Sequence, residues 1–275
     1  MPLSLEESYA HCERIARAKA KNFYYSFLVL PKQKRLAMCA VYAFMRECDD
    51  LSDEAGATQT RLEQWRHDLD DALKGLTGTH PIWPAFADTV HRYKISREYL
   101  DDMITGVTSD LTFTQPANFN ELYLYCYRVA SVVGLTVTHI FGFQKPEALV
   151  MAEKCGIAFQ LTNILRDVRE DAQNYRIYLP ADLMRQYQVP HLNASTPQLE
   201  ALLSDLGQRA RAYFESSRPL ILLVDKDSQS SLWALIEIYD RLLKKIEAAH
   251  FRVMDTRHRL SNVEKLSILA QALFR

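Results

Sequence analysis

Glycine is scarce in this sequence, with only 8 among 275 residues, and strand-like alternation of polar and apolar residues is nearly absent. Both shortages disfavour a sheet, and helix signals recur along the chain instead. Cysteine is also sparse, with no CxxC pair and no regular spacing, which indicates free thiols in a reducing compartment. The cysteines stand at positions 12, 39, 48, 126 and 155.

No charge of one sign dominates, because 33 basic side chains stand against 34 acidic ones and the formal net charge is -1. The chain lacks the basic excess of a phosphate-backbone binder, so we expect no nucleic-acid partner. The longest apolar stretch, Val129 to Phe143, is too short and too polar for a membrane span of ~20 residues. No basic-then-apolar leader follows Met1, so we expect a cytoplasmic protein, which an apolar product would bring to a membrane surface.

Hydrophobic residues make up 48% of the chain, enough for a sizeable core. Helix starts are marked by two capping boxes, in which each side chain satisfies the other residue's backbone N–H. They pair Ser4 with Glu7 and Thr60 with Glu63, and Asn118 is a third candidate cap. Because no linker, repeat or low-complexity tract interrupts the chain, the sequence predicts one all-α domain over residues 1–275.

Two predicted helical segments are apolar on every side, over Leu36–Met45 and Gly156–Leu165. A helix that is hydrophobic all round is usually central in its bundle. Each segment runs directly into a cluster of acids. The first cluster is DDLSD at residues 49–53, and the second is DVRED at residues 167–171.

The outer aspartates of each cluster are four residues apart, so they share one helix face with polar residues that precede them. On the first helix this face holds Tyr42, Arg46, Asp49 and Asp53. On the second helix it holds Gln160, Asn163, Asp167 and Asp171. Each set therefore forms one continuous polar stripe on an otherwise apolar helix.

Carboxylates on such a stripe need cations if the stripe faces the interior. On a solvated helix their repulsion costs only about 0.2–0.5 kcal/mol, but near the interior two carboxylates ~6 Å apart repel by about 2–3 kcal/mol. Hard oxygen ligands without histidine or cysteine favour Mg²⁺, which also takes phosphate oxygens. Arg46 and Arg166, beside the clusters, would bind the same phosphates bidentately. A lone DDxxD is more often a solvated helix end, but two matching stripes on apolar helices favour a metal site.

Four segments in chain order carry a family resemblance. They are KNFYYSFLVLP at Lys21–Pro31, VYAFMRECDDLSDE at Val41–Glu54, YCYRVASVVG at Tyr125–Gly134 and QLTNILRDVREDAQNYRIYLP at Gln160–Pro180. Together they are similar to the squalene/phytoene synthase family over essentially the whole chain. The resemblance implies an all-α isoprenoid synthase helical bundle with a central active-site cavity. It also implies a magnesium-dependent prenyltransferase that couples two prenyl diphosphates head to head.

The resemblance implies roles for individual residues. The implied metal ligands are Asp49, Asp53, Asn163, Asp167 and Asp171. The implied catalytic set is Tyr42, Arg46, Asp49, Asp53, Asp167 and Asp171. The implied substrate contacts are Phe23, Tyr42, Arg46, Tyr125, Val129, Gln160, Asn163, Arg166, Tyr178, Tyr239 and Arg259, with Arg257 as the alternative to Arg259. The first motif reads DDLSD, without the commoner apolar residue before its last aspartate, but its outer ligands are intact.

The branch of the family that makes presqualene diphosphate is favoured by the YYSFLVLPK and MRECDDLSDE segments. We therefore expect two farnesyl diphosphates to condense to presqualene diphosphate, in squalene or hopanoid biosynthesis. Departure of one diphosphate leaves an allylic carbocation, the double bond of the second substrate attacks it, and loss of a proton closes a cyclopropane. The alternative is a dehydrosqualene or phytoene synthase of carotenoid biosynthesis, which shares nearly all the same ligands.

Two other classes of protein compete with this interpretation. A di-iron carboxylate bundle needs two Glu-x-x-His pairs, and the sequence offers one, at Glu247 and His250. A non-catalytic helical scaffold has no reason to carry polar stripes on its most apolar helices. The sequence leaves open the chain length of the substrate, the fate of the cyclopropyl intermediate, any need for NADPH and the oligomeric state.

Overall fold

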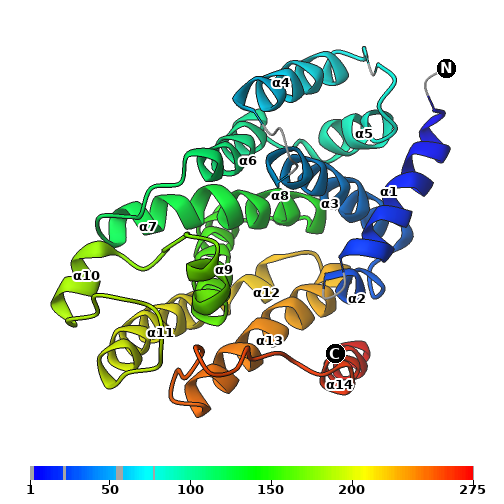
Figure 1. Cartoon of the computed structure of the whole chain (residues 1–275). Coiled ribbons are helices and arrows are strands. Elements are labelled where there is room, and N and C mark those ends of the chain that lie inside the picture. The colour runs from blue at the N-terminus through cyan, green and yellow to red at the C-terminus, as the bar shows by residue number, and fades with distance from the viewer. Residues whose placement is uncertain (1–2, 21–22, 54–57, 77, 275) are drawn as a thin grey trace.

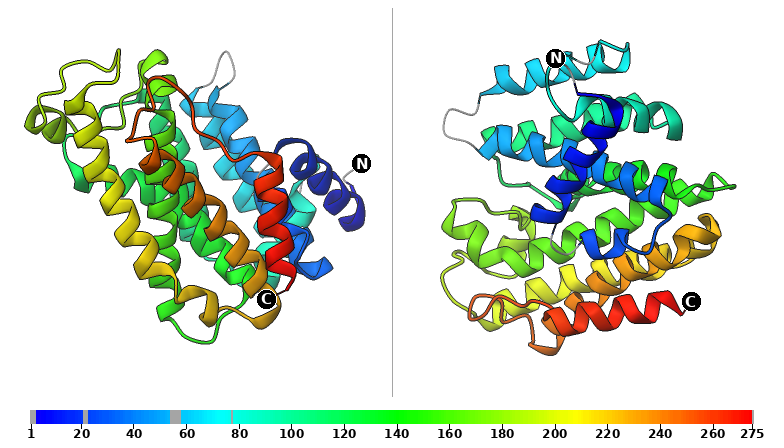
Figure 2. Two further views of the ribbon diagram at one scale, coloured as in Figure 1. Left: turned by 90° about the horizontal axis from the view of Figure 1, so that it is seen from below. Right: turned by 90° about the vertical axis from the view of Figure 1, so that its right-hand side faces the viewer.

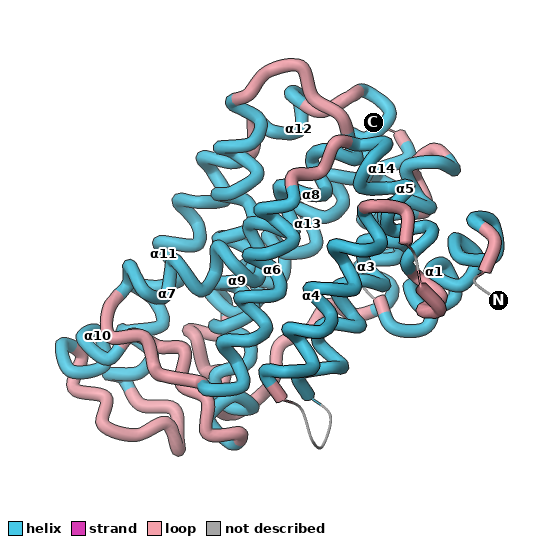
Figure 3. Tube along the Cα trace, turned by 90° about the horizontal axis from the view of Figure 1, so that it is seen from above, coloured by secondary structure: helices cyan, strands magenta, loops and turns pink. Residues whose placement is uncertain are grey.

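The computed structural model describes residues 3–20, 23–53, 58–76 and 78–274, and the side chains of Phe23 and Asp53 lie outside this description. Throughout these ranges the chain forms helices and loops, with one isolated bridge between Phe143 and Val224 and no strand (Figure 3). The all-α isoprenoid synthase fold predicted from the sequence is confirmed.

The helices follow one another with short connections. In chain order they are α1 (Leu5–Lys19), α2 (Phe23–Phe27), α3 (Lys32–Asp53), α4 (Gln59–Leu73), α5 (Trp83–Tyr93), α6 (Arg97–Ser109), η1 (Asp110–Thr112), α7 (Phe119–Cys126), η2 (Tyr127–Ser131), α8 (Val132–Phe141), α9 (Glu147–Gln173), α10 (Ala181–Gln186), α11 (Pro197–Ser217), α12 (Leu220–Leu223), α13 (Lys226–Ala248) and α14 (Asn262–Leu273).

The two segments predicted to be central do lie in the core. Within α3, residues 37–41 are all buried, and within α9, residues 155–158 are all buried. Helix α8 packs against both α3 and α9, while α11 and α13 pack against the other side of α9. Figures 1 and 2 show α4 and α5 beside α3 at one edge of the bundle, and α11 and α13 at the other.

Helices α7, η2 and α8 form one continuous rod with a π-helical segment, η2, at its middle. Residue Gly156 of α9 lets η2 approach closely, because a Cβ at this position would lie 2.5 Å from the Cα of Ser131. The Ser131 hydroxyl also donates to the Glu153 carbonyl at 2.7 Å. A π segment changes which side chains face a neighbour, and such segments are frequent at functional sites.

Helix boundaries follow the predicted caps in two cases of three. Ser4 and Glu7 form the predicted capping box, and Asn118 accepts from the Glu121 N–H. The box predicted at Thr60 is wrong, because α4 begins at Gln59 and its cap is Thr58, whose side chain accepts from the Arg61 N–H. Thr58 has the extended backbone that a cap requires, whereas Thr60 already lies inside the helix.

Two helical stretches, Phe119–Phe141 and Glu147–Gln173, are long and apolar enough to cross a membrane by length and composition alone. About half of each lies buried inside the bundle, as in the core helices of soluble proteins, which pass the same test. They are weak support for any membrane association.

Candidate active site

A cavity of about 250 Å³ lies between α3, the η2–α8 rod, α9 and α13, with α2 and α12 also contributing. Its walls are mainly apolar, and their composition follows from the two all-apolar helices that the sequence places at the centre. Five residues predicted as substrate contacts line it: Tyr42, Val129, Gln160, Asn163 and Tyr239.

The polar stripes of α3 and α9 continue from the wall of this cavity. Tyr42 lines the cavity, and Arg46 and Asp49 follow it on the same face of α3. Gln160 and Asn163 line the cavity from α9, and Asp167 follows one turn later. On both helices, therefore, the acidic residues come directly after the polar residues that line one end of the apolar cavity. Asp53, the last predicted residue of the α3 stripe, has a side chain outside the described part of the structure.

Asp167 is held between two guanidinium groups. Arg166 donates to its Oδ1 through Nε at 2.8 Å, and Nη2 of Arg257 lies 2.8 Å from the same oxygen. Arg257 also donates to Glu170 at 2.7 Å. The sequence left Arg257 and Arg259 as alternatives for a C-terminal phosphate-binding arginine. The structure puts Arg257 at the acidic cluster, whereas Arg259 is exposed and its carbonyl accepts from Lys245 at 3.2 Å.

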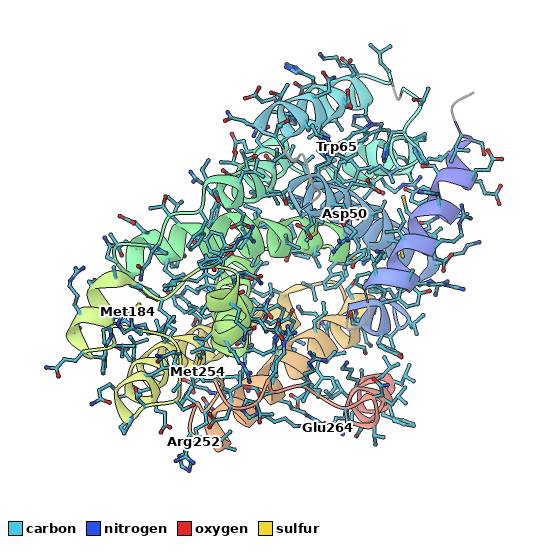
Figure 4. The ribbon with its side chains drawn as sticks, in the orientation of Figure 1. Asp50, Trp65, Met184, Arg252, Met254 and Glu264 are labelled. Carbon is cyan, nitrogen blue, oxygen red and sulfur yellow. The ribbon has the colours of Figure 1, made fainter. Side chains whose placement is uncertain are left out.

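Arg257 reaches the cluster because the segment between α13 and α14 crosses the end of α9. Arg169 donates to the Met254 carbonyl at 3.2 Å and anchors this segment. Figure 4 labels Met254 on this crossing and Asp50 on α3, on the other side of the bundle centre. The sequence carries no periodic signal for such a crossing, so it could not predict that Arg257 lies beside the acidic cluster.

Asp171 shows the carboxylate repulsion that the stripe implies. Burial, with a smaller contribution from the charge of Asp167, raises its pKa from 3.8 to about 7, after the opposing effects of Arg176 and Arg166 are included. A nearby cation would therefore stabilise the ionised form of this carboxyl group.

On α3, Arg46 forms an ion pair with Asp50, one turn later on the same helix. If Arg46 binds diphosphate, as predicted, its guanidinium group must exchange or share its present carboxylate partner, Asp50. The Ser52 hydroxyl donates to the Asp49 carbonyl at 2.8 Å within the last turn of the helix.

The donor set fits a hard cation such as Mg²⁺. The Oδ1 atom of Asn163 is buried and has no hydrogen-bond partner, while its Nδ2 donates to Gln160 at 3.3 Å. An unpartnered buried amide oxygen beside carboxylates is a suitable ligand for an oxygen-preferring ion. Among the residues that the structure describes, no three histidine, cysteine or acidic side chains gather as a preformed metal cluster.

Tyr125 and Tyr178, also predicted as substrate contacts, lie together but outside the lining of the main cavity. Their rings stack with centroids 4.9 Å apart beside a smaller polar pocket of about 230 Å³. Two residues that the sequence did not single out, Asp110 and Arg176, lie next to this pair. No motif marks them, because they come from separate segments that meet only in the fold. Phe23, the remaining predicted contact, has a side chain outside the described part of the chain.

The single Glu-x-x-His match has a structural explanation. Glu247 accepts from Arg211 at 2.7 Å, and His250 lies beyond the end of α13 with a left-handed backbone. These two residues therefore do not share a helix face, as a di-iron site requires.

Comparison with known proteins agrees with this geometry. The family model described as squalene/phytoene synthase matches residues 16–264. A phytoene synthase of Mycobacterium tuberculosis is 35% identical over 280 residues, which cover 98% of this chain and 91% of the relative. A 15-cis-phytoene synthase of Synechococcus elongatus is 33% identical, with 99% and 94% covered.

Solved structures give the same result. The crystal structure of a dehydrosqualene synthase in complex with a ligand superposes with a TM-score of 0.90 at 33% identity, covering 98% of this chain and 96% of the other. Squalene synthase HpnC from Alicyclobacillus acidocaldarius superposes with a TM-score of 0.85 at 25% identity, covering 92% and 97%. The chain thus belongs to the squalene/phytoene synthase family of prenyltransferases, which condense prenyl diphosphates head to head.

Proposed function

We propose that this chain, as one isoprenoid synthase domain over residues 1–275, condenses two farnesyl diphosphates to presqualene diphosphate in squalene or hopanoid biosynthesis. The observation that carries the proposal is the division of the cavity. It is apolar along its length, and its polar end is formed by α3 and α9, the two helices that continue into the acidic clusters. A substrate with a charged head and a hydrocarbon tail matches this division.

The polar end supplies the groups that ionisation of a diphosphate requires. The residues that would hold magnesium are Asp49, Asp53, Asn163, Asp167 and Asp171. Magnesium, when bound, neutralises the diphosphate and assists its departure. Arg46, Arg166 and Arg257 stand beside the same acids and bind phosphate oxygens bidentately.

The apolar walls hold the hydrocarbon tails and exclude water from the carbocation. The rings of Phe159 and Tyr239 both line the cavity and stack with centroids 4.1 Å apart, and aromatic faces stabilise a nearby cation. Three large buried side chains, Phe27, Leu220 and Leu232, line the part of the cavity formed by α2, α12 and the first half of α13. Their bulk, away from the acidic clusters, favours a C15 tail over a C20 tail.

A phytoene or dehydrosqualene synthase is the second candidate. The relatives support it, because the two curated relatives compared above are both phytoene synthases and the first solved structure is a dehydrosqualene synthase. The ligand set is the same for either product, so the difference rests on cavity length and on the fate of the cyclopropyl diphosphate.

The test is incubation of the purified protein with C15 or C20 prenyl diphosphate and Mg²⁺, with and without NADPH, followed by quenching and mass analysis. We expect presqualene diphosphate from the C15 substrate as the main product, with EDTA and the Asp53→Asn variant as inactive controls. Dehydrosqualene as the main product, or phytoene at comparable efficiency from the C20 substrate, selects the second candidate. Absence of any coupled product from either substrate overturns the whole assignment.

We also propose that the protein meets a membrane peripherally when it releases its apolar product. Helix α14 carries exposed apolar side chains at helical spacing, Val263, Leu266 and Leu273, followed by Phe274, which is 92% exposed. Co-sedimentation with phospholipid vesicles should fall when Leu266 and Phe274 are both replaced by serine. Equal sedimentation of the variant and the wild type would contradict this proposal.

A further inference from the structure

The ammonium group of Lys34 joins three helices of the bundle. Lys34 lies near the start of α3, and its Nζ donates at 2.8 Å to the carbonyl oxygen of Phe141, the last residue of α8. It also donates to Asp227 at 2.6 Å, to Asp225 at 3.2 Å and to the Ser228 hydroxyl at 3.0 Å, all at the start of α13. The Lys34 side chain is only 13% exposed. We call these five residues the Lys34 cluster.

The ends of α8 and α13 both favour this cluster. The last carbonyl groups of α8 have no partner within their own helix and form its negative end, which attracts a cation. The first turn of α13 is a positive helix end, and the carboxylates of Asp225 and Asp227 lie there. Gly142 makes room for these acids, because its φ is +77° and a Cβ at this position would lie 2.0 Å from Asp225 Oδ2. The Lys34 ammonium group is thus the cation between one helix end and the acids of another.

The Lys34 cluster lies directly behind the wall of the main cavity. Each of its three helices contributes a cavity-lining residue close to the cluster. These residues are Met38 on α3, Thr138 on α8 and Leu232 on α13. Each of them stands three or four residues from the cluster member on its own helix, and residues at this spacing lie on the same helix face. The cluster therefore fixes the spacing of the three helices at this end of the cavity.

This end of the cavity lies away from the acidic clusters. Helix α3 has 22 residues and is therefore about 33 Å long, with Lys34 near its first residue and Asp49 near its last turn. A prenyl tail whose diphosphate lay beside the acids would extend along the apolar wall toward Met38 and Leu232. The Lys34 cluster would thus lie behind the end of the tail and would touch neither the metal ligands nor the diphosphate.

We propose that Lys34 is a positioning residue that sets the depth of the cavity, and with it the length of the prenyl tail that the enzyme accepts. The inference deepens the proposed function and rests on it for the class of substrate. Without the ammonium group, two carboxylates face the Phe141 carbonyl oxygen with no cation between them, and their repulsion separates the ends of α8 and α13. The cavity then deepens behind Met38, Thr138 and Leu232, while the acidic end keeps its geometry.

The test compares Lys34→Met with the wild type, since methionine keeps the apolar stem and removes the ammonium group. Calorimetry in the presence of Mg²⁺ gives the dissociation constants of unreactive thiolo analogues of the C15 and C20 prenyl diphosphates. We expect the ratio of the C20 to the C15 dissociation constant to fall at least about 10-fold, because apolar pockets discriminate even one methylene by about that factor. A role in stability alone would lower the melting temperature and leave this ratio unchanged.

Two further variants make the test specific. Lys32→Met is the matched control, because Lys32 lies in the same turn of α3 but is exposed and stands outside the cluster. Its ratio should equal that of the wild type. Ser228→Ala is the milder variant, which removes only the hydrogen bond of 2.9 Å from the Ser228 hydroxyl to the Phe141 carbonyl oxygen. It should move the ratio in the same direction as Lys34→Met by a smaller factor, and it decides the question if Lys34→Met does not fold.

Three results would overturn the proposal. They are an unchanged ratio in folded Lys34→Met, an equal shift in Lys32→Met, and an unchanged ratio in Ser228→Ala when Lys34→Met is unfolded. The comparison is between variant and wild type, so tighter binding of the C20 analogue by the wild type would contradict the proposed C15 substrate and leave the role of Lys34 intact. Failure of the wild type to bind either analogue would contradict the proposed function itself.

Discussion

Replacing Asp171 by asparagine should stabilise the protein in the absence of divalent metal while abolishing its activity. Burial and the neighbouring Asp167 raise the pKa of Asp171 from 3.8 to about 7. A carboxyl group whose pKa is higher in the folded state than in the unfolded state destabilises the fold once it ionises. This penalty is absent below about pH 3.8, grows between pH 3.8 and 7, and is complete above pH 7.

The magnitude follows from the size of the shift. Three pKa units correspond to about 4 kcal/mol at about 1.4 kcal/mol per unit. Because the side chain is only partly buried, solvent screening reduces this figure to about 2 kcal/mol. We therefore expect Asp171→Asn to raise the free energy of unfolding in EDTA by about 2 kcal/mol at pH 8 and by about 1 kcal/mol at pH 5.

The assay is urea unfolding followed by circular dichroism at both pH values, with excess EDTA present. Asp167→Asn is the contrasting variant, because Asp167 is paired with Arg166 and Arg257 and its removal leaves both guanidinium groups without this partner. That variant should lower stability by about 2 kcal/mol. If Asp171→Asn destabilises the protein, or stabilises it equally at both pH values, the carboxylate repulsion inferred here does not exist.

Three further predictions concern packing, phosphate binding and metal binding. Gly156→Ala should lower stability by about 1–3 kcal/mol in thermal or urea unfolding, since the new Cβ would lie 2.5 Å from Ser131 Cα. Arg257→Gln should lower kcat/KM at least about 10²-fold through its contact with the acidic cluster, whereas Arg259→Gln should leave steady-state kinetics unchanged. Asp53→Asn should abolish turnover at every Mg²⁺ concentration without loss of helicity, and retained activity would remove this residue from the ligand set.

Much of the fold could be predicted because it follows from local patterns. The apolar segments around residues 37–41 and 155–158 could only be buried, and the helical period places Asp49 and Asp167 on the same faces as Tyr42 and Asn163. Each of these inferences concerns a single helix, and the helical period of 3.6 residues is enough to predict which side chains share a face.

The remaining features depend on contacts between segments that no local pattern encodes. The hydrogen bond from Tyr178 to Asp110 joins a loop to a turn 68 residues away. The position of Arg257 beside Asp167, and of Arg259 on the surface, depends on where the chain crosses α9. The sequence predicted Thr60 as the cap of α4, but the helix begins two residues earlier with Thr58 as its cap, and helix ends are the least certain part of such a prediction.

The ion pairs at the polar end constrain how metal and substrate bind together. Three guanidinium groups that can bind diphosphate, those of Arg46, Arg166 and Arg257, each pair with a carboxylate of the acidic clusters. A diphosphate that took these arginines alone would leave partly buried carboxylates without their ion-pair partners. A cation that took the carboxylates alone would leave guanidinium groups unpaired. Only joint binding satisfies both sets, because the carboxylates then face the cation and the arginines face the phosphate oxygens. If the acids hold magnesium and the arginines hold diphosphate, as proposed above, linkage requires each ligand to increase the affinity for the other by the same factor. On that proposal, ionisation is favoured only when both ligands are present, which protects an allylic diphosphate from premature departure of its leaving group.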